Sequence, residues 1–135
     1  MKISFDFDGC LSEDYIQNLA KSLIDGGNDV WIITARAIFF GGMDKEAYLK
    51  AFNRDIVQVC KEIGLDLSKV IITGGSLKFE YYLSCKFDLH FDDDWEEVLE
   101  INNRGGHAIL VNPDYQRIYM ELQSKNNDND NGTER

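Results

Sequence analysis

The chain has 135 residues, 44% hydrophobic and 12% aromatic, which suits a single globular domain with an ordinary core. Its formal net charge of -10 argues against nonspecific binding to nucleic-acid duplexes, because an acidic surface repels phosphodiester backbones. Three scattered cysteines without a CxxC pair argue against a disulfide framework or zinc site. The chain shows no leader and no long apolar run, so we expect a cytoplasmic protein that does not span a membrane.

Short apolar runs alternate with helix-like segments in the first part of the chain. Residues 2–7 (KISFDF) predict a strand, and residues 12–25 predict a helix with Ser12 as its N-cap and a stop at the two glycines that follow. Residues 29–35 (DVWIITA) predict a second strand, and their continuous apolar character is typical of a strand that is buried on both faces.

The middle of the chain opens with an unusually apolar loop at residues 37–43. A long helix is then predicted from its cap at Asp44 to Ile63, with Gly64 as its stop. Residues 69–75 (KVIITGG) predict the third strand, and residues 76–85 a short helix.

The remaining segments continue the alternation. We predict a strand at 88–93, a helix at 95–103 that is capped by Asp94, a strand at 107–113 and a last helix at 115–123. The domain is expected to span residues 1–123, and the polar tail 124–135 is expected to be disordered. Alternating strands and helices indicate a parallel sheet that is covered on both faces.

Polar side chains gather where the predicted strands end. In an open parallel sheet the carboxyl ends of the strands form the ligand-binding edge. The candidate residues at this edge are Asp6, Asp8, Thr34, Ala35, Arg36, Lys78, Asp92 and Asp93. Several carboxylates at one place are costly unless a cation neutralises them, and Mg²⁺ prefers such oxygen ligands. The pattern therefore predicts a Mg²⁺ site next to a phosphate site.

These motifs, DFDGC, then ITAR, then a lysine, then HFDDD, resemble the haloacid dehalogenase (HAD) superfamily of phosphotransferases. The resemblance covers roughly residues 3–94, with the four motifs in the family's order. It implies a single Rossmann-like three-layer α/β/α domain with a five-stranded parallel sheet in the order 3-2-1-4-5. Only one helix and a turn separate the first two motifs, so the chain resembles the members that lack a cap domain.

The resemblance also implies roles for the site residues. Asp6 would be the nucleophile that forms an aspartyl-phosphate, and Asp8 the general acid and base. Thr34 and Lys78 would contact the transferring phosphoryl group. Apart from the resemblance, Ala35 and Arg36 are expected at the substrate site, where Arg36 would contact a substrate phosphate or a second charged group, because its planar fork suits bidentate oxygen pairs. Mg²⁺ would be held by Asp92, Asp93, the Asp6 carboxylate and the Asp8 backbone carbonyl.

Two features leave the motif assignment partly open. Cys10 stands where the family usually has Thr or Val, and we expect it to support the loop. Lys78 fits the third motif best because it opens a helix, and Lys86 is the alternative. His90 and His107 are interpreted as structural, and Glu96, Glu97 and Glu100 as a solvated acidic helix face.

Other protein classes fit the sequence less well. A receiver domain would carry its phosphorylated Asp at the end of the third strand, which here ends in Thr73 and Gly74. No cysteine has an arginine six positions later, as a cysteine-based phosphatase requires, and no GxxxxGK[ST] motif occurs. A non-catalytic or regulatory HAD-like binding protein remains the alternative.

The substrate is not specified by the sequence. An open site would suit a nucleotide, a nucleic-acid end, a sugar phosphate or a phosphoprotein, and a homo-oligomer could supply a missing lid. The loop 37–43 begins beside the predicted phosphate site. It could either form a substrate wall or pack into the core through Phe39 and Phe40.

Overall fold

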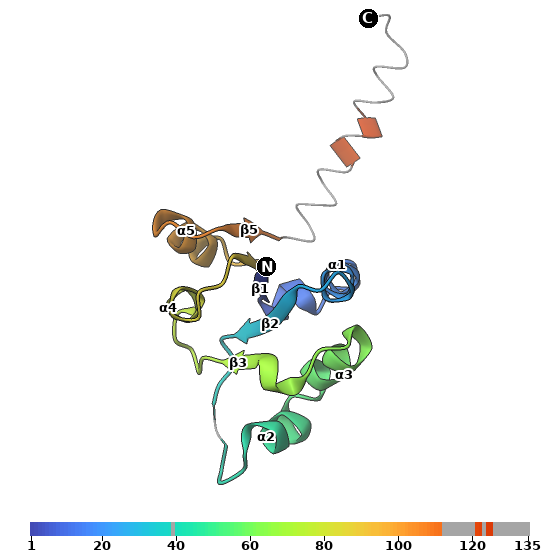
Figure 1. Ribbon diagram of the computed structural model, residues 1–135, viewed down its shortest axis with the longest axis vertical. Helices are drawn as coiled ribbons and strands as arrows, with labels where there is room; N and C mark the ends of the chain where they lie inside the picture. The colour runs from blue at the N-terminus through green and yellow to red at the C-terminus, as the bar shows by residue number, and fades with distance from the viewer. Residues whose placement is uncertain (39, 112–120, 123, 126–135) are drawn as a thin grey trace, which may run out of the picture.

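A computed structural model describes residues 1–38, 40–111, 121–122 and 124–125. Its centre is one parallel sheet in the order β3-β2-β1-β4-β5 (Figure 1). The strands are β1 (Lys2–Phe5), β2 (Asp29–Thr34), β3 (Val70–Ile72), β4 (Leu89–Asp92) and β5 (Ala108–Leu110). The predicted fold class and strand order are therefore confirmed.

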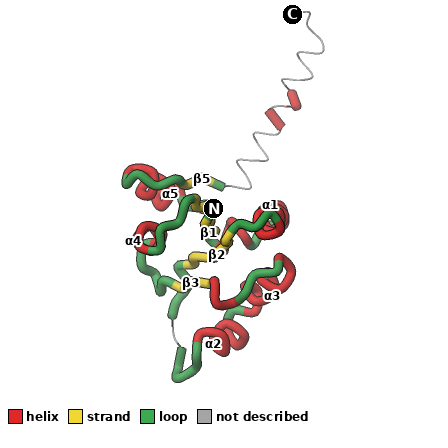
Figure 2. Tube along the Cα trace, viewed as in Figure 1, coloured by secondary structure: helices red, strands yellow, loops and turns green. Residues whose placement is uncertain are grey.

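Helices cover both faces of the sheet (Figures 1 and 2). One face carries α1 (Asp14–Asp25), α2 (Lys45–Phe52) and α3 (Arg54–Ile63), and the other carries α4 (Lys78–Ser84) and α5 (Trp95–Asn103). Neighbouring residues of β2 serve the two faces, because Ile32 belongs to the larger buried cluster and Ile33 to the smaller one. This explains why the β2 sequence is apolar without alternation.

Several predicted helix ends are confirmed by their local hydrogen bonds. Asp44 and Asp94 cap α2 and α5, each accepting a hydrogen bond from a backbone N–H in the first turn. Gly64 ends α3 in the left-handed conformation, with φ of +80°. Ser12 is not the N-cap of α1: that helix begins at Asp14, and the Ser12 hydroxyl instead accepts a hydrogen bond from the Gly9 N–H at 3.1 Å.

The long helix predicted from Asp44 to Ile63 is two helices. They meet at Asn53, whose backbone is not helical (φ −133°, ψ 51°) and which is buried. Its side-chain oxygen accepts a hydrogen bond from Arg36 at 3.0 Å, so a long-range contact replaces helical continuity at this residue. The hydrophobic pattern did not indicate the break, because buried residues recur on both sides of it, Tyr48 and Leu49 in α2 and Ile56 in α3.

The predicted acidic face of α5 is only partly solvated. Glu97 is buried, and its two carboxylate oxygens accept hydrogen bonds from the N–H groups of Lys78 (3.2 Å) and Phe79 (3.1 Å) at the start of α4. Glu96 is exposed as predicted, and Glu100 forms a surface ion pair with Arg104. Glu97 therefore joins the two helices of this face.

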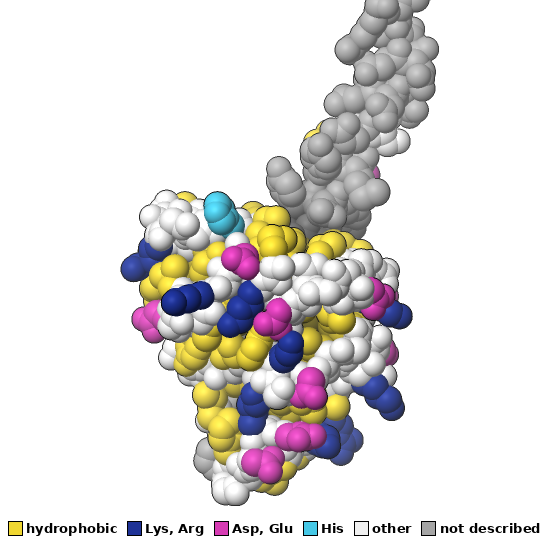
Figure 3. All heavy atoms as spheres, in the orientation of Figure 1, with side chains coloured by type: hydrophobic (Ala, Val, Ile, Leu, Met, Phe, Trp, Pro, Cys, Tyr) yellow, Lys and Arg dark blue, Asp and Glu magenta, His cyan; other side chains and the backbone are white. Residues whose placement is uncertain are grey.

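The chain ends and the surface complete the description. Most of the predicted helix 115–123, and most of the tail 124–135, lie outside the described residues. Acidic and basic side chains are interspersed on the face shown in Figure 3, with no region of one sign. None of the described helices has the length and apolar character needed to cross a membrane.

Candidate active site

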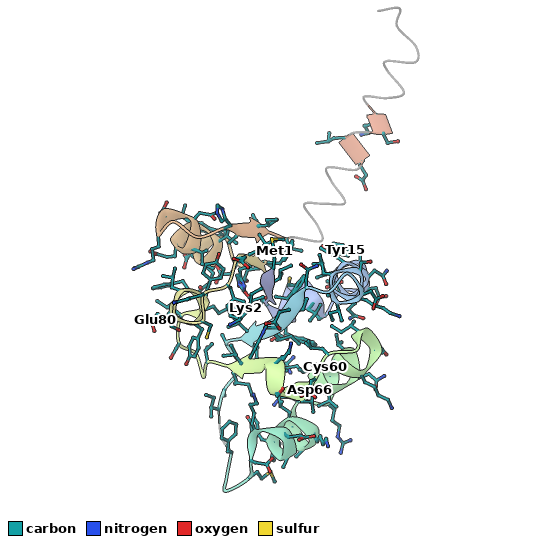
Figure 4. The ribbon with its side chains drawn as sticks, viewed as in Figure 1. Met1, Lys2, Tyr15, Cys60, Asp66 and Glu80 are labelled. Carbon is teal, nitrogen blue, oxygen red and sulfur yellow. The ribbon has the colours of Figure 1, made fainter. Side chains whose placement is uncertain are left out.

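The central feature of the site is a buried lysine between two buried aspartates. Asp6 directly follows β1, Asp92 ends β4 and Lys78 begins α4. The Lys78 Nζ lies 2.8 Å from Asp6 Oδ1 and 3.0 Å from Asp92 Oδ2. Lys2, which is labelled in Figure 4, begins β1 and marks its amino end, whereas Asp6 follows the carboxyl end of the strand. The site thus lies at the carboxyl ends of the strands, where the sequence predicts it.

The two candidate lysines lie in different places, and their positions favour Lys78. Lys86 follows α4 with a positive φ of 57° and lines a separate cavity with Tyr82 and His107. Lys78 is the lysine that contacts the aspartates of the site.

Burial and charge act on the three ionisable groups of this cluster in different ways. Burial raises the pKa of Asp6 to about 8, helped by the neighbouring carboxylates of Asp92 and Asp93 and opposed by Lys78. Burial alone would lower the pKa of Lys78, but its two aspartate partners raise it. Burial works against the ionised form of Asp92, yet His90 and Lys78 hold its pKa below the ordinary value. Of the two buried aspartates, Asp6 is thus the one whose negative charge is less well compensated.

The same aspartates form a candidate metal site. Asp6, Asp92 and Asp93 each place a carboxylate oxygen within 4.8 Å of the others. The donor set is made of oxygen atoms alone, and it carries more negative charge than Lys78 neutralises. Both properties fit a hard divalent cation such as Mg²⁺.

Gly9 permits the close approach of Asp93 to the turn after β1. A Cβ on Gly9 would overlap the Asp93 carboxylate, and its φ of +72° also favours glycine. The Asp8–Gly9 turn and the residue that follows β4 therefore pack in close contact.

A buried polar chain behind Asp92 was not identified from the sequence. His90 Nδ1 lies 2.7 Å from Ser4 Oγ, and His90 Nε2 lies 2.8 Å from Asp92 Oδ2. Ser4 and His90 are also register partners on β1 and β4. A signal was present, because each of them stands two residues before a site aspartate. Interpreting His90 as structural is consistent with this contact, since it orients Asp92.

Asp8 and Arg36 form a second cluster at the edge of the site. In a strand over residues 2–7, as the sequence predicts, Asp6 and Asp8 would point to the same side. The strand β1 instead ends at Phe5 and the chain then turns, so this alternation does not apply to the two aspartates. Asp6 contacts Lys78, whereas the exposed Asp8 contacts Arg36 through both of its oxygens at 2.7 and 3.0 Å. The two carboxylates therefore have different partners and different solvent access.

These residues border one open pocket of about 460 Å³. Its lining comprises Asp6, Asp8, Ala35, Arg36, Lys78, Asp93 and Asp94. Thr34 is buried, and its Oγ1 accepts a hydrogen bond from the Arg36 N–H at 3.3 Å, which leaves the hydroxyl proton free for another acceptor. The predicted site residues are therefore brought together, six of them as lining and two, Thr34 and Asp92, outside it.

Cys10 lies beneath the turn and away from the pocket lining. It is buried, its Sγ lies 3.6 Å from the carbonyl oxygen of Phe91, and burial raises the pKa of its thiol. Its position fits the predicted supporting role, because a protonated, buried thiol is a poor nucleophile.

The apolar loop 37–43 is partly anchored to the core. The Phe40 ring packs edge-on against Tyr48 with centroids 5.0 Å apart, and the Tyr48 hydroxyl donates to the Ala37 carbonyl at 2.9 Å. Ile38 is 45% exposed, and Phe39 lies outside the described residues. The core interpretation is therefore supported at Phe40.

Comparison of the chain with protein-family models, with curated proteins and with solved structures gave no match. The geometry of the site is consequently what supports a function.

Proposed function

We propose that the protein is a Mg²⁺-dependent phosphomonoester hydrolase of the HAD-like type that acts through an aspartyl-phosphate. The observation that carries the proposal is the contact of Lys78 with both Asp6 and Asp92 at the base of an open pocket, with Asp93 beside them. Such a grouping offers a carboxylate nucleophile, a fixed cation and oxygen ligands for a metal within one site.

The first half-reaction transfers the phosphoryl group to the protein. A carboxylate oxygen of Asp6 attacks phosphorus, the bond between phosphorus and the leaving oxygen breaks, and Asp8 gives that oxygen a proton. Lys78 orients the Asp6 carboxylate and counters negative charge on the phosphoryl oxygens, and Thr34 donates its free hydroxyl proton to one of them.

The second half-reaction restores the enzyme. Asp8, now ionised, takes a proton from water as the water oxygen attacks phosphorus, and the bond from phosphorus to Asp6 breaks. The products are inorganic phosphate and the free Asp6 carboxylate, so that atoms and protons balance over the cycle. Asp8 is exposed at the pocket edge, where both the leaving group and the water arrive.

Mg²⁺ would be held by Asp6, Asp92, Asp93 and the backbone carbonyl of Asp8, and it would supply charge neutralisation to the phosphoryl group. The Asp92 carboxylate is already engaged by Lys78, His90 and the Asp94 N–H. That engagement fixes the carboxylate in place, which is what a metal ligand requires.

The pocket is open because the segments after β1 and β3 are short. Only a turn and α1 lie between β1 and β2, and only residues 73–77 lie between β3 and α4. This favours a large phosphorylated substrate or a lid from another molecule. A nucleotide, a nucleic-acid end, a sugar phosphate and a phosphoprotein all remain candidates.

A panel of phosphomonoesters tests the proposal, including p-nitrophenyl phosphate and oligonucleotides that carry a 3′- or 5′-phosphate. We expect turnover with Mg²⁺, none after EDTA, and none in Asp6→Asn. Full turnover in a metal-free sample would exclude this mechanism. Binding of Mg²⁺ and phosphate without turnover of any ester would instead favour the non-catalytic HAD-like binding protein.

A further inference from the structure

Arg36 uses its entire hydrogen-bonding capacity within the protein. A guanidinium has five N–H donors, and five hydrogen bonds of Arg36 side-chain atoms are present at 2.6–3.0 Å. Two go to Asp8, two to Asp55 and one to Asn53. The guanidinium also lies over the Phe7 ring, 5.0 Å from its centroid, which fixes its plane. No N–H remains for a substrate phosphate.

The charges around Arg36 also argue against a contact with the substrate phosphate. One guanidinium is shared by two carboxylates, so the group of Asp8, Arg36 and Asp55 carries a net negative charge whenever Asp8 is ionised, as it is after the proton transfer. Such a group repels a phosphate dianion unless another cation intervenes. Lys78 lines the same pocket.

The break between α2 and α3 supplies two of the three acceptors. A continuous helix would also carry Asn53 in a helical position, as Arg54 and Asp55 are in α3. Instead α2 ends at Phe52 and Asn53 turns its side-chain oxygen to Arg36, two residues before Asp55 adds its two oxygens. The non-helical backbone of Asn53 thus serves a contact with the end of β2.

We propose that Arg36, Asp55 and Asn53 are positioning residues that hold the Asp8 carboxylate at the pocket edge, and that Arg36 is not a ligand of the substrate phosphate. The inference rests on the proposed function, in which Asp8 transfers the proton. It replaces the sequence-based expectation that Arg36 contacts the substrate.

Asp8 needs such support because, among the residues that the structure describes, Arg36 is the one that contacts its carboxylate. Its side chain is 61% exposed, and it precedes Gly9 in a turn. A single exposed ion pair orders side chains weakly. A bidentate contact to an arginine that is itself anchored on its other side is much more directional. When Asp8 gives up one contact to transfer a proton, Asp55 and Asn53 keep Arg36 in place for its return.

Kinetics with two leaving groups can distinguish a role of Arg36 in positioning Asp8 from a role in binding the substrate phosphate. Phenyl phosphate needs its leaving oxygen protonated, whereas p-nitrophenyl phosphate needs this much less. We expect Arg36→Lys and Asp55→Asn to lower kcat on phenyl phosphate about tenfold or more, because small displacements of a catalytic group are costly. The loss on p-nitrophenyl phosphate should be smaller, with KM and inhibition by inorganic phosphate changed less than twofold.

Arg104→Lys is the matched control, because Arg104 pairs with Glu100 on the surface of α5 and is outside the pocket lining. It should leave both substrates unaffected. The proposal is overturned if Arg36→Lys raises KM and weakens phosphate inhibition while Asp55→Asn does neither, since Arg36 would then bind the substrate. It is also overturned if kcat/KM, which reports the first half-reaction, falls equally for both substrates in both variants.

An NMR measurement keeps this inference distinct from the phosphatase assignment. The Arg36 Nε–H should give a signal that is protected from solvent exchange, that Asp55→Asn weakens, and that inorganic phosphate with Mg²⁺ does not shift. If the wild-type protein hydrolyses no ester, the phosphatase assignment fails. This signal alone then tests whether Arg36 is held by Asp8, Asp55 and Asn53. A rapidly exchanging signal, or one that shifts with phosphate, refutes it.

Discussion

At the scale of single residues, the two aspartates of the first motif are separated by environment. Asp6 is buried against Lys78, while Asp8 is exposed and paired with Arg36. A nucleophile benefits from a fixed position and a low-dielectric surrounding. A proton donor must instead reach the leaving group and water. The different surroundings of two residues only two positions apart therefore match the two roles that the proposed mechanism assigns.

We expect Asp6→Asn to abolish turnover, because an amide has almost the same shape but cannot attack phosphorus. Asp8→Asn should impair release of poor leaving groups while still allowing aspartyl-phosphate to form from p-nitrophenyl phosphate. Steady-state turnover and acid-quench detection of protein-bound phosphate measure the two effects. If Asp6→Asn keeps near wild-type kcat, the covalent mechanism is wrong.

Sequence patterns predicted those site residues whose signal is local. Asp6, Asp92 and Lys78 follow or precede clear apolar runs, so the common edge of the sheet could be inferred. The contacts of Arg36 with Asp55 and of Glu97 with α4 join distant parts of the chain. Neither leaves a local signature, because an arginine after a strand, or a glutamate in the first turn of a helix, looks the same in the sequence whether it is solvated or paired.

At the scale of secondary-structure elements, α4 depends on α5 for its beginning. The buried Glu97 accepts hydrogen bonds from the N–H groups of Lys78 and Phe79, where α4 has no side-chain cap of its own. Burial raises the pKa of Glu97, so its charge is held at some cost. The contact places Lys78 as well as stabilising the helix.

Glu97→Ala should lower the free energy of unfolding by about 1–3 kcal/mol, since two buried N–H groups lose their acceptor. Urea denaturation measures the change. Glu96→Ala, on the exposed side of the same turn, should change it by less than about 0.5 kcal/mol. Equal effects of the two variants would show that the Glu97 contact contributes nothing specific.

The loop 37–43 offers a second test at this scale. Phe40→Ala removes a ring that packs on Tyr48 and should cost about 1–2 kcal/mol, less than a fully buried phenylalanine. Ile38→Ala should be nearly neutral for stability. Melting temperature and KM are measured together. A raised KM for Phe40→Ala at unchanged stability would favour the substrate-wall interpretation instead.

At the scale of the whole molecule, the alternation of elements was enough to predict the fold. Each strand is a short apolar run that is bounded by polar or glycine residues, and a parallel sheet of such runs leaves few alternatives. The division of the long helix at Asn53 could not be predicted in this way. At the break Asn53 accepts a hydrogen bond from Arg36, which lies just after β2 and which no periodic pattern marks.

The site also links the stability of the whole molecule to pH and metal. The pKa of Asp6 is raised from 3.8 to about 8 in the folded, metal-free protein. The folded state therefore binds more protons than the unfolded state between these values, and the stability contributed by Asp6 is present below the lower value and lost as pH rises toward about 8. Mg²⁺ competes with this proton, so it should bind poorly at pH 5 and well at pH 8.

We therefore expect Mg²⁺ to raise the melting temperature of the wild-type protein more at pH 8 than at pH 5, relative to samples in EDTA. Asp6→Asn carries no titrating carboxyl at this position, so its melting temperature should respond little to Mg²⁺ and should lack the loss of stability toward pH 8. Scanning calorimetry at intervals between the two pH values measures both effects. An equal Mg²⁺ response at both pH values in the wild-type protein, or an unchanged response in Asp6→Asn, would mean that the ion binds elsewhere on this acidic chain.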